Sequence, residues 1–135
     1  MKKLVILGAG SGGTMMANKM RKQLDNDWSI TLIDKDNVHY YQPGFLFIPF
    51  GVYTKKDVIK PKANFIPFGV NFINSKIDRI EGEANKVHLE DGMVLNYDYL
   101  VIATGVGIVP EETPGMKGEL WHKQVFDFYT IEGAM

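Results

Sequence analysis

Hydrophobic and polar residues follow two different patterns along this chain. Short, nearly continuous apolar runs indicate strands that are covered on both faces, as in a parallel sheet. Between the first two runs, apolar residues recur at spacings of three and four, which predicts an amphipathic helix over roughly 12–24. The predicted parallel strands cover roughly 3–8, 29–34, 69–74 and 99–104.

A glycine-rich turn lies between the first predicted strand and the helix. It has the spacing G-x-G-x-x-G, and an acid closes the second strand about twenty residues later. Glycines in this pattern permit a tight turn, a close approach of the backbone to a pyrophosphate, and close helix packing. The acid accepts hydrogen bonds from a ribose diol and disfavours a 2′-phosphate. The sequence therefore predicts a dinucleotide site at Gly8, Gly10, Ser11, Gly12, Gly13 and Asp34.

The middle of the chain departs from this alternation. Residues 37–54 are strongly aromatic and contain two prolines, so the segment is too apolar for a solvated loop. It must pack on the core, on a ligand or on another part of the protein. A short helix is expected over 55–60, ended by Pro61.

Three short strands with turns between them are predicted over 76–81, 86–89 and 93–96, and Asp91-Gly92 gives a hairpin signal. They form an antiparallel meander that connects the third parallel strand to the fourth. Right-handed crossovers then give the strand order 3-2-1-4 of a Rossmann-like α/β fold. A loop is expected over 107–123, and a helix begins within 127–135. Such sheets usually have further strands, so residues 1–135 are interpreted as the N-terminal portion of a longer fold.

Composition narrows the function. The 135 residues suffice for one domain with a core, and the net charge of −1 gives no basic field for nucleic acid. There is no cysteine, so the chain carries no disulfide and no thiolate site. No spacing typical of metal ligands occurs, and no apolar run reaches the length of a membrane helix.

The string Asp98-Tyr99-Leu100-Val101-Ile102-Ala103-Thr104-Gly105 resembles the second FAD motif of flavoproteins with two dinucleotide-binding domains. In that superfamily the first Rossmann unit holds FAD. The resemblance implies that the chain is part of an FAD-binding domain and that Ala103, Thr104 and Gly105 pass close to FAD. NAD in the first unit is the alternative.

The segment His39-Tyr40-Tyr41-Gln42-Pro43-Gly44-Phe45 is similar to the corresponding segment of sulfide:quinone oxidoreductases. The resemblance implies that sulfide is oxidised at cysteines beside the flavin and that electrons pass to a membrane quinone. This chain would supply only the FAD site, and it would be inactive alone. Two alternatives stay open: a type II NADH:quinone oxidoreductase, whose aromatic-proline segment is similar, and a free-standing dinucleotide-binding domain.

Three further residues are candidate cofactor contacts. Lys35 is expected near the adenine or a phosphate, unless it is merely exposed, and Ile77 offers backbone hydrogen bonds to the adenine. Gln42 lines the flavin or quinone pocket, unless it belongs to a packed surface loop. The resemblance also implies a protein on the cytoplasmic side, peripheral to the membrane through regions outside this chain, and it leaves homo-oligomerisation open.

Overall fold

The computed structural model describes all residues, 1–135, and the chain divides into two compact units. The first unit comprises Met1–His39 and Pro61–Gly105, and the second comprises Tyr40–Lys60 and Val106–Met135. Each unit has its own buried core. No helix in the chain has both the length and the apolar character needed to cross a bilayer.

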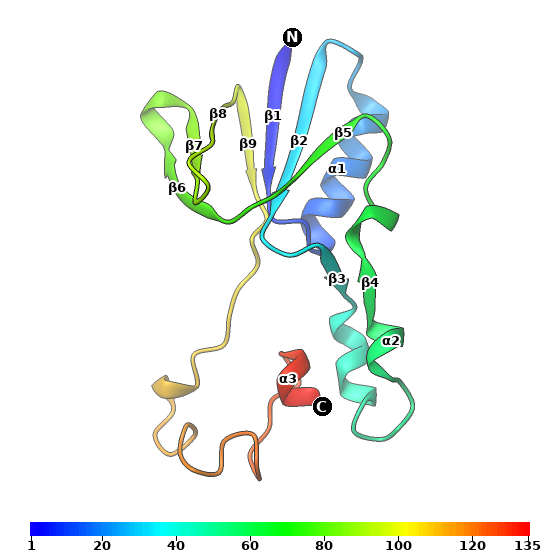
Figure 1. Ribbon diagram of the computed structural model, residues 1–135, viewed down its shortest axis with the longest axis vertical. Helices are drawn as coiled ribbons and strands as arrows, with labels where there is room; N and C mark the ends of the chain where they lie inside the picture. Colours follow the sequence, from blue (N-terminus) through cyan, green and yellow to red (C-terminus); the bar gives the residue numbers. More distant parts are fainter. The chain divides into compact units, whose positions relative to one another are not determined.

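The first unit is built on a parallel sheet of four strands, ordered β5-β2-β1-β9 (Figure 1). Its strands are β1 (Lys2–Leu7), β2 (Trp28–Asp34), β5 (Val70–Asn74) and β9 (Tyr99–Ile102). The central strand β1 pairs with β2 and β9, so that Leu4 lies beside Ile30 and Tyr99. This confirms the order 3-2-1-4 predicted from the sequence.

Both faces of β1 are buried, which explains its continuous apolar run. On one face, Leu4 and Ile6 pack with Ala17 of helix α1 (Ser11–Gln23). On the other face, Val5 and Leu7 pack with Val87 of the meander. Successive residues of a strand point to opposite faces, so one strand serves both layers.

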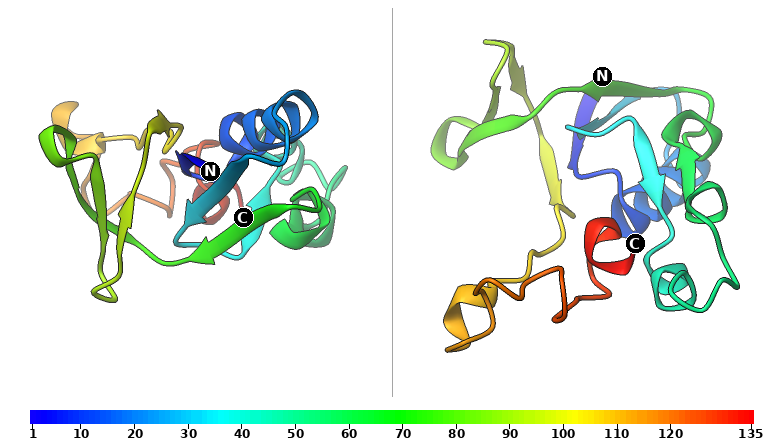
Figure 2. Two further views of the ribbon diagram at one scale, coloured as in Figure 1. Left: turned by 90° about the horizontal axis from the view of Figure 1, so that it is seen from above. Right: turned by 60° about the horizontal axis from the view of Figure 1, so that its bottom comes forward.

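The meander comprises β6 (Ile77–Glu81), β7 (Lys86–Leu89) and β8 (Val94–Asn96). β7 pairs with both neighbours in antiparallel fashion, as predicted. Figure 2 shows these strands as a separate small layer near β9. The apolar positions of β7, Val87 and Leu89, are buried, whereas the intervening His88 pairs with Glu81 at 2.9 Å.

One pair of strands was not predicted. β3 (Val38–Tyr40) and β4 (Ile59–Pro61) form a two-stranded ribbon. The helix expected over 55–60 is shorter than predicted: α2 covers Lys55–Val58, because the residues before Pro61 are extended. Three-residue strands are too short to produce a recognisable alternation.

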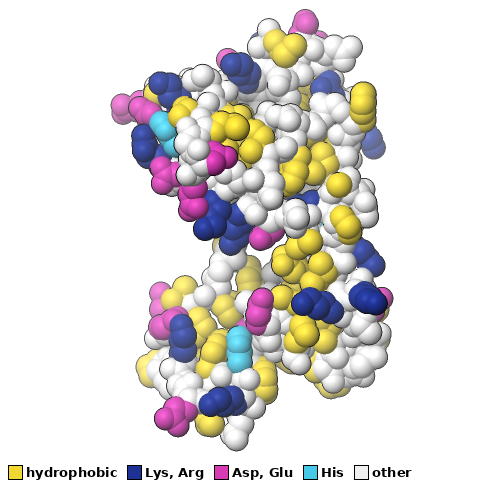
Figure 3. Space-filling model, in the orientation of Figure 1, with side chains coloured by type: hydrophobic (Ala, Val, Ile, Leu, Met, Phe, Trp, Pro, Cys, Tyr) yellow, Lys and Arg dark blue, Asp and Glu magenta, His cyan; other side chains and the backbone are white.

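The second unit contains the 3-10 helix η1 (Gln42–Phe47), helix α2 and helix α3 (Ile131–Ala134). Its core consists of Phe45, Val58 and Ala134. The aromatic segment is therefore only partly buried: Phe45 is 2% exposed, whereas Phe50 is 73% exposed. Apolar side chains lie on the surface over η1 and α2, with lysines beside them (Figure 3).

Helix α3 begins at Ile131, inside the range predicted for it. Its start is set by Thr130, whose hydroxyl accepts a hydrogen bond from the Gly133 N–H. The carboxylate of Asp127 accepts hydrogen bonds from the N–H groups of Tyr129 and Thr130 and holds the chain in a bend before the helix. Because side chains accept these hydrogen bonds from backbone N–H groups, the helix begins here and does not extend by another turn toward the N-terminus.

Candidate functional site

The glycine turn between β1 and α1 contains two glycines that the protein itself requires. Gly8 has a φ of +89°, and an added Cβ would lie closer than 3.0 Å to the backbone of Ala103. An added Cβ on Gly13 would lie equally close to the carbonyl oxygen of Gly8. Real Cβ atoms essentially never approach so closely. Glycine at position 8 therefore lets the chain after β1 lie close to the chain after β9, and glycine at position 13 lets α1 pack closely on the end of β1.

Gly10 and Gly12 are different. An added Cβ on Gly10 would meet no atom within 4 Å, and one on Gly12 would make only an ordinary contact with Ala103 at 3.8 Å. Both residues are exposed, as is Ser11 between them. Packing within the protein therefore does not require a glycine at position 10. Because Gly10 has no side chain, a ligand can approach the backbone closely there.

The same turn forms the amino end of α1. Gly10 is the N-cap, no side chain caps this end, and the first turn contains no acidic residue. The N–H groups at the start of a helix have no partner within the helix, and the helix dipole makes this end positive. At the amino end of a helix of 13 residues, these features fit a pyrophosphate.

Asp34 ends β2 beside the glycine turn. Its Oδ2 accepts a hydrogen bond from the Ala9 N–H at 2.6 Å, and its Oδ1 accepts one from the Asp36 N–H at 2.9 Å. Its backbone carbonyl is also fixed, since it accepts hydrogen bonds from Ser75 and from the Asn74 amide. The structure therefore brings the predicted acid into direct contact with the predicted turn.

The carboxylate of Asp34 has a third partner that the sequence did not reveal. Lys62 lies 2.8 Å from Oδ2, and its side chain is only 5% exposed. Burial by itself raises the pKa of Asp34, but its three donors, led by the Asp36 N–H, outweigh burial, so its pKa lies below the ordinary value of 3.8. Asp34 is therefore ionised at neutral pH.

The carboxyl end of β9 lies against the same turn. The Ala103 N–H donates to the carbonyl of Leu7 at 2.7 Å, which extends the pairing of β9 with β1 by one residue. Thr104 and Gly105 follow as exposed residues, and Gly105 has a φ of +75°. The structure thus brings the predicted Ala103–Gly105 segment to the glycine turn, at the sheet edge where α/β folds bind ligands.

The three remaining candidates stay predictions. Lys35 directly follows Asp34 and is exposed. Ile77 opens β6 opposite Leu89, and its side chain packs against the buried core, so only its backbone remains for a ligand. Gln42 belongs to the second unit, where its amide donates to the Tyr129 carbonyl at 3.2 Å.

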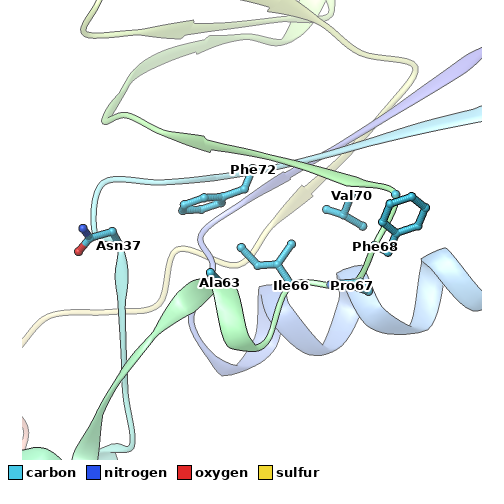
Figure 4. Close-up of a pocket in the computed structure, with 8 residues that line it drawn as sticks. Asn37, Ala63, Ile66, Pro67, Phe68, Val70 and Phe72 are labelled. Carbon is cyan, nitrogen blue, oxygen red and sulfur yellow. The ribbon is translucent and has the colours of Figure 1, made fainter.

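A separate shallow hollow of about 500 Å³ lies in the first unit between β5 and the segment that follows the 3-10 helix η2 (Lys62–Asn64). Phe72 of β5 and Ile66 lie on opposite sides of it (Figure 4). Asn37 is its only side chain with a polar group. The hollow contains none of the predicted cofactor residues.

Comparisons with known proteins agree with this geometry. The family model described as pyridine nucleotide-disulphide oxidoreductase matches residues 2–132. The mitochondrial sulfide:quinone oxidoreductase of Dictyostelium discoideum is 31% identical over 132 residues, which cover 98% of this chain and 29% of that protein. A type II NADH:quinone oxidoreductase of Staphylococcus haemolyticus is 35% identical over 119 residues, covering 87% of this chain and 29% of that protein.

Among solved structures, the sulfide:quinone oxidoreductase of Aquifex aeolicus superposes with a TM-score of 0.83 at 32% identity. The match covers 99% of this chain and 30% of that chain. The chain therefore spans less than a third of the length of the relatives that it matches.

Proposed function

Since the chain belongs to the pyridine nucleotide-disulphide oxidoreductase family, we propose that its first unit binds FAD. In this proposal the glycine turn and the amino end of α1 hold the pyrophosphate, and Asp34 holds the ribose of the adenosine half. The observation that carries the proposal is the contrast among the glycines. Gly8 and Gly13 are required by packing, whereas Gly10 has open space where a side chain would be.

The residues of this chain bind and orient the cofactor. The uncapped start of α1 offers N–H groups and a positive dipole to the pyrophosphate. Thr104 and Gly105 add little bulk at the sheet edge, which leaves room for the flavin half. Bound FAD supplies hydride and electron transfer, while the protein supplies its position and surroundings.

For the whole protein we propose oxidation of sulfide and reduction of a membrane quinone. The support is the similarity to two sulfide:quinone oxidoreductases over nearly the entire chain. The chain contains no cysteine, so the sulfur chemistry would fall to residues outside it. We accordingly interpret residues 1–135 as the N-terminal portion of the enzyme, and we expect this chain alone to turn over neither substrate.

The second candidate is an NADH:quinone oxidoreductase. A specific observation favours it: the 35% identity to the Staphylococcus haemolyticus enzyme. That function would need no sulfur nucleophile, which is consistent with the lack of cysteine in this chain. In either case the whole protein would associate peripherally with the membrane, on the cytoplasmic side, to reach its quinone.

An anaerobic titration of the purified full-length protein separates the candidates. Its absorption spectrum is recorded while sulfide, and then NADH, is added. Bleaching of the flavin bands by sulfide alone is the expected result. Bleaching by NADH alone would assign the protein to the NADH:quinone branch, and the absence of flavin bands would refute FAD binding.

A further inference from the structure

Lys62 is a buried cation beside the candidate ribose site. The residue as a whole is 4% exposed. Its ammonium lies 2.8 Å from Asp34 Oδ2 and donates to the Asp36 carbonyl at 2.9 Å. Its backbone N–H donates to the Asn37 carbonyl, which fixes the residue beside the start of β3.

Such a placement is costly. An ammonium loses its hydration when it is buried, and lysine also loses much side-chain freedom when it is held in one geometry. Exposed lysines, such as the nearby Lys60, keep their hydration. Burial of the Lys62 ammonium therefore needs a physical explanation, because an exposed lysine would cover the sheet equally well.

The hydrogen-bonding capacity of Asp34 and Lys62 gives a reason for burying this lysine. A carboxylate has about four acceptor positions, two on each oxygen. On Asp34, Oδ2 already accepts from Ala9 and Lys62, and Oδ1 accepts from Asp36. One acceptor position is left, on Oδ1. A ribose diol presents two hydroxyl groups, so this carboxylate can accept a hydrogen bond from only one of them.

The ammonium of Lys62 has the complementary capacity. It carries three N–H donors, and two of them are used by Asp34 and Asp36. We propose that Lys62 is a second ribose ligand, which donates its third hydrogen bond to the hydroxyl that Asp34 cannot bind. The diol is then recognised by a matched acceptor and donor. This proposal rests on the proposed dinucleotide site.

The test uses flavin-free full-length protein and isothermal titration with ADP, 2′-deoxy-ADP and 3′-deoxy-ADP. The variant Lys62→Met removes the donor, and Lys60→Met is the matched control at an exposed lysine. We expect wild type and control to bind each deoxynucleotide about tenfold more weakly than ADP, because each lacks a hydroxyl that Asp34 or Lys62 holds. In Lys62→Met, ADP binding should fall by a similar factor. The preference for one of the two hydroxyls should disappear, while the preference for the hydroxyl held by Asp34 persists.

A purely structural role of Lys62 gives a different result, because ADP and both deoxynucleotides then weaken by the same factor. That outcome, or unchanged binding by Lys62→Met, would overturn the proposal. If wild type binds neither ADP nor FAD, the proposed function fails first and this inference fails with it. If wild type binds FAD while both hydroxyl preferences survive in Lys62→Met, only this inference fails.

Removing one partner of a buried ion pair can prevent folding. The double variant Asp34→Asn/Lys62→Met removes both charges together and leaves no unpaired carboxylate. We expect it to bind ADP and both deoxynucleotides with affinities within about twofold of one another, since both ribose ligands are altered. A hydroxyl preference that persists in this variant would contradict the proposal.

Discussion

The contrast between Gly10 and Gly13 gives the sharpest test of the glycine turn. In Gly13→Ala the new methyl group meets the carbonyl oxygen of Gly8, closer than 3.0 Å, and both partners are backbone-defined. Neither can move without shifting α1 from β1, so the cost should reach the upper end of the overpacking range, about 3 kcal/mol. Gly10→Ala meets no atom within 4 Å, and the φ of −74° at Gly10 suits alanine. Its cost should stay within about 1 kcal/mol.

Cofactor binding should respond in the opposite sense. A methyl group on Gly10 occupies the space through which the backbone meets the pyrophosphate. We expect at least a tenfold weaker affinity for FAD, which corresponds to about 1.4 kcal/mol. The assay combines denaturant unfolding of the flavin-free full-length protein with titration of FAD fluorescence. FAD affinity within twofold of wild type in Gly10→Ala would show that position 10 does not meet the pyrophosphate, and unchanged stability in Gly13→Ala would show that the packing at position 13 does not require glycine.

Three further predictions concern Asp34 and the second unit. The ionised carboxylate of Asp34 stabilises the fold fully above its ordinary pKa of 3.8, and this stabilisation is lost as the pH falls through the lower pKa of the folded state. In Asp34→Asn the free energy of unfolding should therefore fall less steeply with decreasing pH in this acid range. An equally steep fall in the variant would exclude this role. Phe45→Ala should cost about 3–5 kcal/mol because its ring is buried, whereas Phe50→Ala should cost less than about 0.5 kcal/mol; equal unfolding midpoints would contradict this. The 135-residue chain should self-associate through exposed apolar residues such as Phe47 and Phe50, and light scattering that shows a monodisperse monomer would disprove it.

The sequence predicted the sheet well because its strands are buried on both faces. A strand such as β1, whose residues Val5 and Ile6 face opposite layers, reads as an uninterrupted apolar run and leaves little ambiguity. The glycine spacing identified the turn because Gly8 and Gly13 are sterically obligatory. The order of the strands then followed from the handedness of the crossovers.

The partner of Asp34 could not be predicted in the same way. Lys60 and Lys62 flank Pro61 symmetrically in the sequence, and nothing in the pattern distinguishes the exposed lysine from the buried one. Only the three-dimensional placement of η2 beside the end of β2 brings Lys62 to the carboxylate. This pairing also changes one argument from the sequence. An unpaired carboxylate would repel a 2′-phosphate, but the charge of Asp34 is balanced by Lys62. Charge alone therefore disfavours a dinucleotide with a 2′-phosphate less strongly than the sequence suggested.

The aromatic segment shows a different limit. Its apolar composition correctly indicated that it must pack, and Phe45 does so within the second unit. Composition could not say which rings are buried, because the 3-10 helix η1 turns only part of the segment toward Val58. Phe50 consequently remains exposed although it is as apolar as Phe45.

Binding of FAD by the first unit can be checked by releasing the nucleotide from the purified full-length protein with heat and identifying it by chromatography and mass. We expect one FAD per chain in wild type and a clear loss of FAD in Gly10→Ala. Release of NAD in place of FAD, or of no dinucleotide from a folded protein supplied with FAD, would contradict this expectation.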